Sequence, residues 1–164
     1  MNGLDEGEPQ NAASELIAQL ALAPHPEGGH YRRTYVSQAE VCRDGQSRPA
    51  LTAIAFLLAQ GERSAWHRVD AEEAWHWQQG APLELRIFDP VTGHLQRLQL
   101  DAASHGGPAM AVVPSGCWQA ARTLGAFTLV ACTVSPGFVW EGFALLEPGS
   151  GIARAISAAG GDLD

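Results

Sequence analysis

The stretch GERSAWHRVDAEEAWHWQQG, residues 61–80, decides the fold of this chain. Aromatic and polar residues alternate on both sides of a short acidic break, which is typical of two β-strands joined by a turn. Side chains two positions apart in a strand share a face, so Glu73, Trp75 and Trp77 are expected to lie together. With His67, they make the stretch either one half of a chemical site or a strand pair that contains histidine.

Similar strands are predicted on both sides of this stretch. Each is an apolar or alternating run that ends at Gly, Pro or Asp. The run at 50–59 is apolar on both faces, which predicts a strand that is covered on both sides. Ten short strands at this spacing indicate an all-β antiparallel sandwich or barrel. Their expected ranges are 30–37, 50–59, 65–69, 73–79, 83–88, 94–100, 110–113, 118–122, 127–134 and 143–146.

One short helix is predicted near the amino terminus, over about residues 11–22. Asn11 can cap its first turn, and Leu16, Ile17 and Leu20 supply an apolar stripe. The prolines that follow end it.

The composition describes one globular domain. The chain has 164 residues, of which 46% are hydrophobic, enough to build a single core. We expect this domain to cover residues 11–156, with flexible ends at 1–10 and 157–164. No apolar run approaches the roughly 20 residues of a membrane span, so we expect no membrane partner. The acidic, polar start resembles neither a secretory signal nor a transit peptide, which predicts a cytoplasmic protein.

The charged residues exclude several function classes. The net charge is −8, and all ten cationic side chains are scattered arginines, a pattern that repels nucleic acid. Without a lysine, the chain has neither a Schiff-base lysine nor a Walker-type phosphate loop. The three cysteines form no CxxC pair and are expected to be reduced.

The spacing of the opening stretch resembles the first motif of the cupin superfamily. That motif reads Gly, five residues, His-x-His, three or four residues, Glu, six residues, Gly. Here Gly61, His67, Glu73 and Gly80 match, and Val69 stands at the second histidine. The second cupin motif is Pro-x-Gly, two residues, His, three residues, Asn. Residues 114–123 resemble it, with glutamine and threonine at its last two positions.

Over about residues 16–143 the chain resembles an uncharacterised cupin family whose members are often labelled predicted sugar epimerases. The resemblance implies a double-stranded β-helix, the jelly-roll cupin barrel, with a ligand pocket inside it, and a homodimer. The matching blocks are HPEGG at 25–29, Tyr31-Arg32, Thr34-Tyr35, WHRV at 66–69, the E-x-W-H of 73–76, VPSGCWQAA at 113–121 and CTVSPGF at 132–138.

The four positions that bind metal in cupins carry His67, Val69, Glu73 and Gln119 here. Valine has no donor atom and glutamine is a weak neutral ligand, so we expect no metal or other cofactor. His67, Glu73 and Gln119 are only weak metal candidates. A metal-dependent oxygenase or isomerase would require a further ligand, such as His30.

The first functional hypothesis is a metal-independent enzyme that abstracts a proton beside a carbonyl of a sugar-like substrate, as related cupin epimerases do. His67 would be the base, oriented by Glu73, and Tyr35 would be the acid on the opposite face. The substrate-binding candidates are Gln119, Trp75, Trp77 and Arg32.

The second hypothesis is a non-catalytic cupin that holds a small polar metabolite with the same side chains. Each of them also has a structural interpretation. His67 paired with Glu73 can satisfy buried polarity, and Trp75 and Trp77 can fill the core. The sequence leaves these alternatives open.

Overall fold

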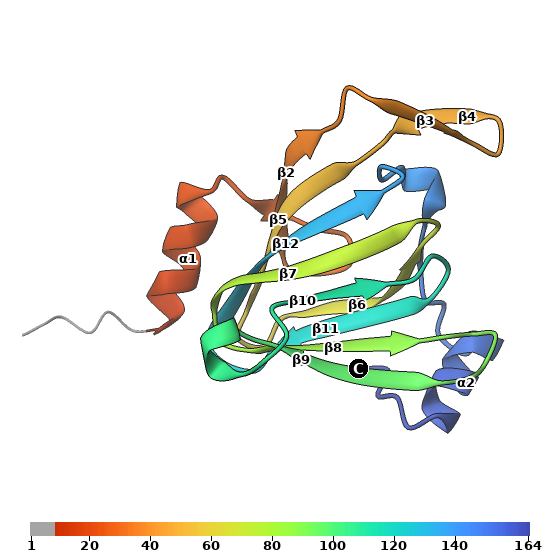
Figure 1. The fold of residues 1–164 in the computed structure, drawn as a ribbon. Helices are drawn as coiled ribbons and strands as arrows, with labels where there is room; N and C mark the ends of the chain where they lie inside the picture. The colour runs from red at the N-terminus through yellow and green to blue at the C-terminus, as the bar shows by residue number, and fades with distance from the viewer. Residues whose placement is uncertain (1–8) are drawn as a thin grey trace, which may run out of the picture.

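The computed structural model describes residues 9–164 (Figure 1). The flexible segment expected at residues 1–10 lies outside these residues, except for Pro9 and Gln10, which begin α1 (Pro9–Gln19). This helix corresponds to the one predicted near the amino terminus. No helix within the described part of the chain has the length and apolar character needed to cross a bilayer.

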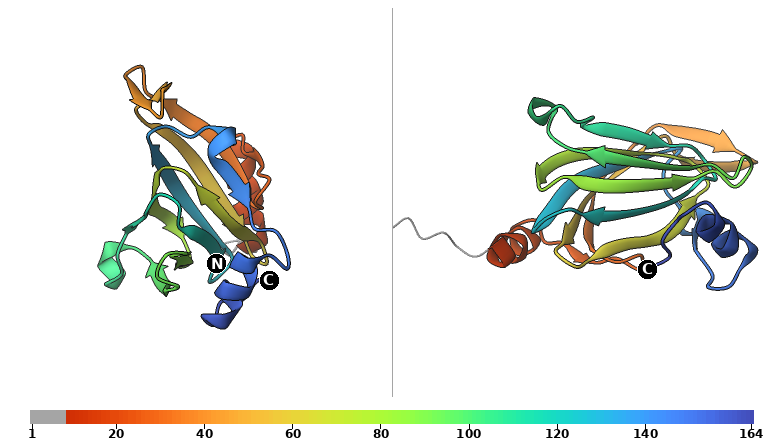
Figure 2. Two further views of the ribbon diagram at one scale, coloured as in Figure 1. Left: turned by 90° about the vertical axis from the view of Figure 1, so that its right-hand side faces the viewer. Right: turned by 90° about the horizontal axis from the view of Figure 1, so that it is seen from below.

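Two antiparallel sheets form the body of the molecule, which confirms the all-β prediction, and each of the ten predicted strands is present (Figure 1). The six-stranded sheet has the order β1 (Ala23–Pro24), β2 (His30–Val36), β5 (Thr52–Ala59), β12 (Phe127–Ser135), β7 (Glu72–Gly80), β10 (Met110–Val113). The five-stranded sheet has the order β13 (Phe143–Leu145), β6 (Arg63–Val69), β11 (Trp118–Thr123), β8 (Leu83–Phe88), β9 (Leu95–Leu100). The two sheets form the two layers of a sandwich (Figure 2).

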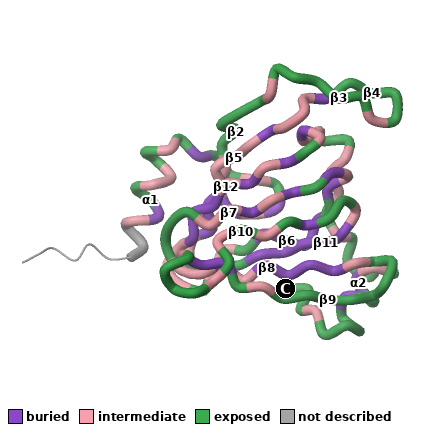
Figure 3. The backbone as a smooth tube through the Cα atoms, viewed as in Figure 1, coloured by how far each residue is buried: buried purple, intermediate pink, exposed green. Residues whose placement is uncertain are grey.

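The main core lies between the sheets. Phe56 and Trp75 from the six-stranded sheet pack with Leu85 and Ile87 from β8. The central strands carry most of the buried residues (Figure 3). As predicted, β5 is covered on both faces, because Leu58 joins the main core and Leu57 packs under α1.

The hairpin of β3 (Glu40–Arg43) and β4 (Gln46–Pro49) was not predicted. Its strands are polar and mostly exposed, so they lack the apolar alternation by which strands are recognised. Asp44 and Gly45 form its two-residue turn with φ of 52° and 78°, the conformation that Asp-Gly favours in tight hairpins. That dipeptide was the available signal.

A second helix, α2 (Gly151–Ala158), was also not predicted. Ser150 caps its first turn by accepting a hydrogen bond from the backbone N–H of Ala153. Ile156 is fully buried against the outer face of the five-stranded sheet. Ser157 and Ala158, which we expected to belong to a flexible end, are the last residues of this helix.

Candidate functional site

A cavity of about 600 Å³ lies between the two sheets. The six-stranded sheet contributes residues of β1, β2, β5, β7 and β12 to its wall, together with Ala21 just before β1, and the five-stranded sheet contributes residues of β6 and β13. The turn before β2 and the segment before β13 complete the wall.

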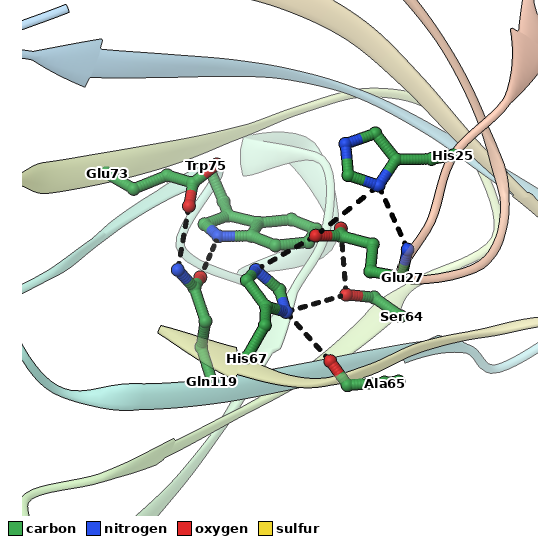
Figure 4. Close-up of polar contacts among 8 residues, drawn as sticks. All are labelled: His25, Glu27, Ser64, Ala65, His67, Glu73, Trp75 and Gln119. Atoms are coloured by element: carbon green, nitrogen blue, oxygen red, sulfur yellow. Dashed lines mark hydrogen bonds and ion pairs between the residues drawn. The ribbon is translucent and has the colours of Figure 1, made fainter. Parts of the chain in front are cut away.

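His67 of β6 is buried in the wall of this cavity and is held on both ring nitrogens (Figure 4). Nδ1 lies 2.7 Å from the carbonyl oxygen of Ala65, and because a carbonyl only accepts, Nδ1 carries a hydrogen. Nε2 lies 3.1 Å from Oε2 of Glu27. One proton must therefore lie between Nε2 and that carboxyl oxygen.

The environment of the Glu27 and His67 pair favours the proton on Glu27. Burial raises the pKa of Glu27 to about 8, and the hydrogen bond from Ser64 Oγ to its Oε1 at 3.0 Å opposes this only partly. Burial lowers the pKa of His67, against the opposing effects of the Glu73 charge and the Ala65 carbonyl. At neutral pH a protonated carboxyl of Glu27 thus donates to a neutral imidazole.

Glu27 reaches the cavity through the tight HPEGG turn. Gly28 has a φ of +104°, and a Cβ at this position would overlap the carbonyl of Arg63 on β6. The backbone N–H of Ala65 donates to the Glu27 carbonyl at 2.7 Å, which ties the turn to the same strand. Only glycine fits this approach, so the HPEGG block serves to bring a carboxyl beside His67.

Glu73 of β7 is the second buried carboxyl on the cavity wall. Its Oε2 accepts a hydrogen bond from Gln119 Nε2 at 2.7 Å, and Gln119 Oε1 in turn accepts from Trp75 Nε1 at 2.7 Å (Figure 4). Burial raises the pKa of Glu73 to about 7, while the His67 charge lowers it. The carboxyl is therefore poised to gain or lose a proton near neutral pH.

His25, from the same turn as Glu27, is a further buried imidazole that the motif comparison did not single out. Its Nδ1 accepts from the backbone N–H of Glu27 at 3.1 Å and lies 3.7 Å from Oε2 of that residue. Burial, with the His67 charge, lowers the pKa of His25 to about 4. It is a neutral acceptor at physiological pH.

Three aromatic side chains of the cavity wall, Phe138, Trp140 and Phe143, lie next to the two histidines: the Phe143 ring centroid is 5.6 Å from that of His67, and the Trp140 centroid is 5.8 Å from that of His25. Trp140 packs edge-to-face on Phe138 and Phe143, with ring centroids 4.9 and 5.5 Å away. Trp140 is nevertheless 48% exposed. Arg32 and Arg33 of β2 also line the cavity.

Of the predicted site residues, the structure brings His67, Glu73 and Arg32 to the cavity wall. Gln119 and Trp75 lie behind Glu73, both 1% exposed, and reach the cavity only through that carboxyl. We predicted that Glu73 pairs with His67 and orients it; in the structure the carboxyl in contact with the His67 ring is that of Glu27, whose Oε2 lies 3.1 Å from Nε2.

The structure does not bring Tyr35 or Trp77 to the cavity. A register shift of β2 against β5 lies between Arg33 and Tyr35, and the tyrosine is 54% exposed. Trp77 lies four residues beyond Glu73, about 13 Å along the strand, where it packs on the core and donates to the Ala81 carbonyl.

The side chains at the cavity do not fit a metal centre. Within residues 9–164, no group of three or more His, Cys, Asp or Glu side chains is placed to hold a metal ion. Both ends of the Gln119 amide are already hydrogen bonded, and Val69 has no donor. We named His30 as the further ligand that a metal enzyme would need. Its Nδ1 lies 3.5 Å from Oε1 of Glu62, and the residue is not part of the cavity wall.

Comparison with known proteins agrees with the architecture. The sequence profile of a family described as "Cupin superfamily (DUF985)" matches residues 14–146. A protein of known structure from Shewanella oneidensis is 34% identical, with a TM-score of 0.78 over 90% of this chain and 92% of that one. A hypothetical protein from Leishmania major is 30% identical, with a TM-score of 0.75 over 82% of this chain and 86% of that one. No curated protein matches the sequence.

More distant similarity extends to an enzyme of known activity. Oxalate decarboxylase from Bacillus subtilis is 14% identical, with a TM-score of 0.58 over 85% of this chain and 34% of that one. At this identity the similarity concerns the fold alone. The family profile covers most of the chain, and the two relatives from Shewanella and Leishmania share about a third of its residues. The chain therefore belongs to the cupin superfamily, in the family designated DUF985.

Proposed function

We propose that this cupin binds a small polar metabolite and catalyses proton transfer on it without a metal, as an epimerase- or isomerase-like enzyme acting on a sugar-like compound. The observation that carries the proposal is the meeting of Glu27, His67 and Glu73 at one cavity. Buried carboxyls whose pKa values lie near neutrality are suited to general acid–base catalysis.

The two carboxyls provide complementary roles. Glu73, with a pKa of about 7, is partly ionised at neutral pH and accepts a proton from the carbon beside a carbonyl. The pair of Glu27 and His67 holds one proton between Oε2 and Nε2 and returns it. Because these groups come from different segments of the chain, donor and acceptor are separate, as epimerisation requires. Tyr35, our predicted acid, has no part in this proposal.

A second candidate function is non-catalytic binding. It is favoured by the burial of His67, which is 1% exposed and has both ring nitrogens occupied by the protein. This arrangement also describes a structural histidine. In that case the cavity would hold the same class of metabolite without turnover.

Hydrogen exchange separates the two functions. Keto sugars and sugar nucleotides are incubated with the protein in D₂O, and NMR follows deuterium entry beside the carbonyl. We expect exchange with the wild type and a loss of about 100-fold or more in Glu73→Gln. His105→Gln, which changes a surface histidine outside the cavity wall, should exchange at the wild-type rate.

Circular dichroism and thermal melting establish that Glu73→Gln is folded. A compound that raises the melting temperature of the wild type, while no compound tested exchanges deuterium, would replace the catalytic proposal by the binding one.

We also propose that the protein is a homodimer in the cytoplasm. The family resemblance supports the dimer, and the free thiols of Cys42, Cys117 and Cys132 are consistent with a reducing compartment. Light scattering tests the dimer, because a mass of one chain at micromolar concentration would contradict it.

A further inference from the structure

Two arginines at the cavity have no carboxylate partner. Arg32 and Arg33 follow each other on β2 and both line the cavity. Within the described residues, no Asp or Glu oxygen lies within 4.0 Å of either guanidinium, although Arg48, Arg86 and Arg122 have such partners. The charge of Arg32 and Arg33 is therefore available to a ligand.

The acidic groups at the cavity do not cancel this positive charge. Glu141 is exposed at the wall, and the other two carboxyls, Glu27 and Glu73, are buried. Burial raises the pKa of both, so they hold protons for much of the time at neutral pH. A chain of net charge −8 thus has a cavity whose wall carries two arginines and only one exposed carboxyl group, that of Glu141.

Trp140 belongs to the same cavity wall as these two arginines. The side chain is 48% exposed although it belongs to the cavity wall, and it packs edge-to-face on the ring of Phe138. The guanidinium of Arg33 lies 6.0 Å from the Phe138 ring centroid. An exposed indole and unpaired guanidinium groups in the wall of one cavity offer a surface for a ring and a site for an anion.

Residues 137–142, the segment that carries Phe138 and Trp140, are held in place by Arg48 of β4. Its Nε and Nη2 donate to the carbonyl of Gly137 at 3.0 and 2.7 Å, and its Nη1 and Nη2 donate to both carboxylate oxygens of Asp70 at 3.0 and 3.1 Å. The backbone N–H of Asp70 donates to the carbonyl of Gly142 at 3.0 Å. Both ends of the segment 137–142 are fixed, so a ligand need not order it.

From this placement we infer that the cavity selects a ligand in which an anionic group, a carboxylate or a phosphate, is attached to a ring. Arg32 and Arg33 bind the anionic group by charge-assisted hydrogen bonds, and Trp140 covers the ring. The inference rests on the cavity being a ligand site, as in the proposed function, and does not depend on proton transfer.

Binding of matched probes tests the inference by calorimetry or tryptophan fluorescence. One set is glucose, glucuronate and glucose 6-phosphate; the other is benzamide, benzoate and phenyl phosphate. In at least one set we expect an anionic probe to bind the wild type about tenfold or more tightly than its neutral counterpart. The preference should weaken as NaCl is added. The anionic probe that binds more tightly, the carboxylate or the phosphate, identifies the anionic group that the cavity prefers.

The double variant Arg32→Gln/Arg33→Gln should lose that preference. Arg63→Gln is the matched control, because Arg63 is another exposed strand arginine without a salt bridge but is not part of the cavity wall. The control should bind as the wild type does. The inference is wrong if no anionic probe is preferred at concentrations up to about 10 mM, or if the double variant retains the preference.

The outcome is independent of the deuterium experiment. Preferred binding of anionic probes without exchange in any compound overturns the catalytic proposal and leaves this inference standing. Deuterium exchange in neutral sugars, without any preference for anionic probes, overturns this inference and leaves the catalytic proposal standing.

Discussion

At the scale of single residues, Trp75 sets the orientation of an amide on which Glu73 depends. An indole N–H only donates, so the oxygen of Gln119 must face Trp75 and its nitrogen must face Glu73. Trp75 is therefore a positioning residue that acts on the cavity through Gln119 without touching a ligand.

Trp75→Phe keeps a ring in the core and removes this donor. The amide of Gln119 is then free to turn, and because its hydrogen bond lowers the pKa of Glu73, we expect that pKa to rise above the wild-type value. The loss in stability should be about 1–3 kcal/mol. NMR titration of labelled glutamate measures the pKa. Trp77→Phe, which also loses one indole hydrogen bond, should leave the titration of Glu73 unchanged.

The two buried carboxyls also make stability depend on pH. A carboxyl whose pKa is raised on folding contributes stability below its unfolded pKa of 4.5, and this is lost as pH rises toward the folded value, about 8 for Glu27 and 7 for Glu73. The pKa values of His25 and His67 are lowered on folding, so these histidines make the protein more stable as the pH rises. This effect operates only below their unfolded pKa of 6.5.

Between pH 6.5 and 8, of these four groups only the two carboxyls should still change the stability. We expect each carboxyl to lower the free energy of unfolding by up to about 1.4 kcal/mol per pH unit as the pH rises. Glu27→Gln should reduce this slope, whereas Glu147→Gln, at an exposed position, should not. Urea unfolding at the two pH values measures it. A wild type equally stable at both would contradict the protonated state assigned to Glu27.

At the scale of elements, the β3–β4 hairpin supports the cavity from outside. Arg48 of β4 is 5% exposed and is the donor for both Gly137 and Asp70. Removing it would leave a backbone carbonyl and a carboxylate without their partner.

Arg48→Met, which keeps most of the side-chain volume, should lower the free energy of unfolding by about 2–3 kcal/mol. The carboxylate of Asp70 is 44% exposed, so the cost should stay below that of a fully buried pair. Arg122→Met breaks an exposed pair with Glu84 and should cost at most about 1 kcal/mol. Equal losses in urea unfolding would show that Arg48 does not hold the segment.

At the scale of the whole molecule, the carboxyl-terminal segment covers the outer face of the five-stranded sheet. Ile156 packs with Trp66, Phe88 and Trp118. Beyond α2, the backbone carbonyl of Asp162 accepts hydrogen bonds from Trp66 Nε1 at 2.8 Å and Arg86 Nη1 at 3.0 Å. These bonds join residues that are 96 and 76 positions apart in the sequence.

Deletion of residues 159–164 should lower stability by about 1–3 kcal/mol, because two donors that are largely buried lose their acceptor. Asp162→Ala keeps the main-chain carbonyl and should cost less than half as much. Thermal melting compares the two proteins. A truncated protein as stable as the wild type would show that the segment after α2 makes no contribution.

Much of the fold is predictable from the sequence. Runs such as 83–88 and 127–134 carry the alternating or doubly apolar character of strands, and that character is local. The hairpin at 40–49 has no such pattern because most of its residues are polar and exposed, so the sequence does not predict it. The helix α2 is short, and its burial depends on a sheet face built by other segments.

The sequence by itself determined ten of the strands, the cupin motif and the two residues that the motif positions, His67 and Glu73. Only the tertiary structure decided that Glu27 is the partner of His67, that Arg32 reaches the cavity and that Tyr35 does not. The physical reason is that strand formation depends on neighbours in sequence. A hydrogen bond or a cavity wall depends instead on the distance between segments that are separated in sequence, here set by a glycine turn against β6 and a shifted register in β2.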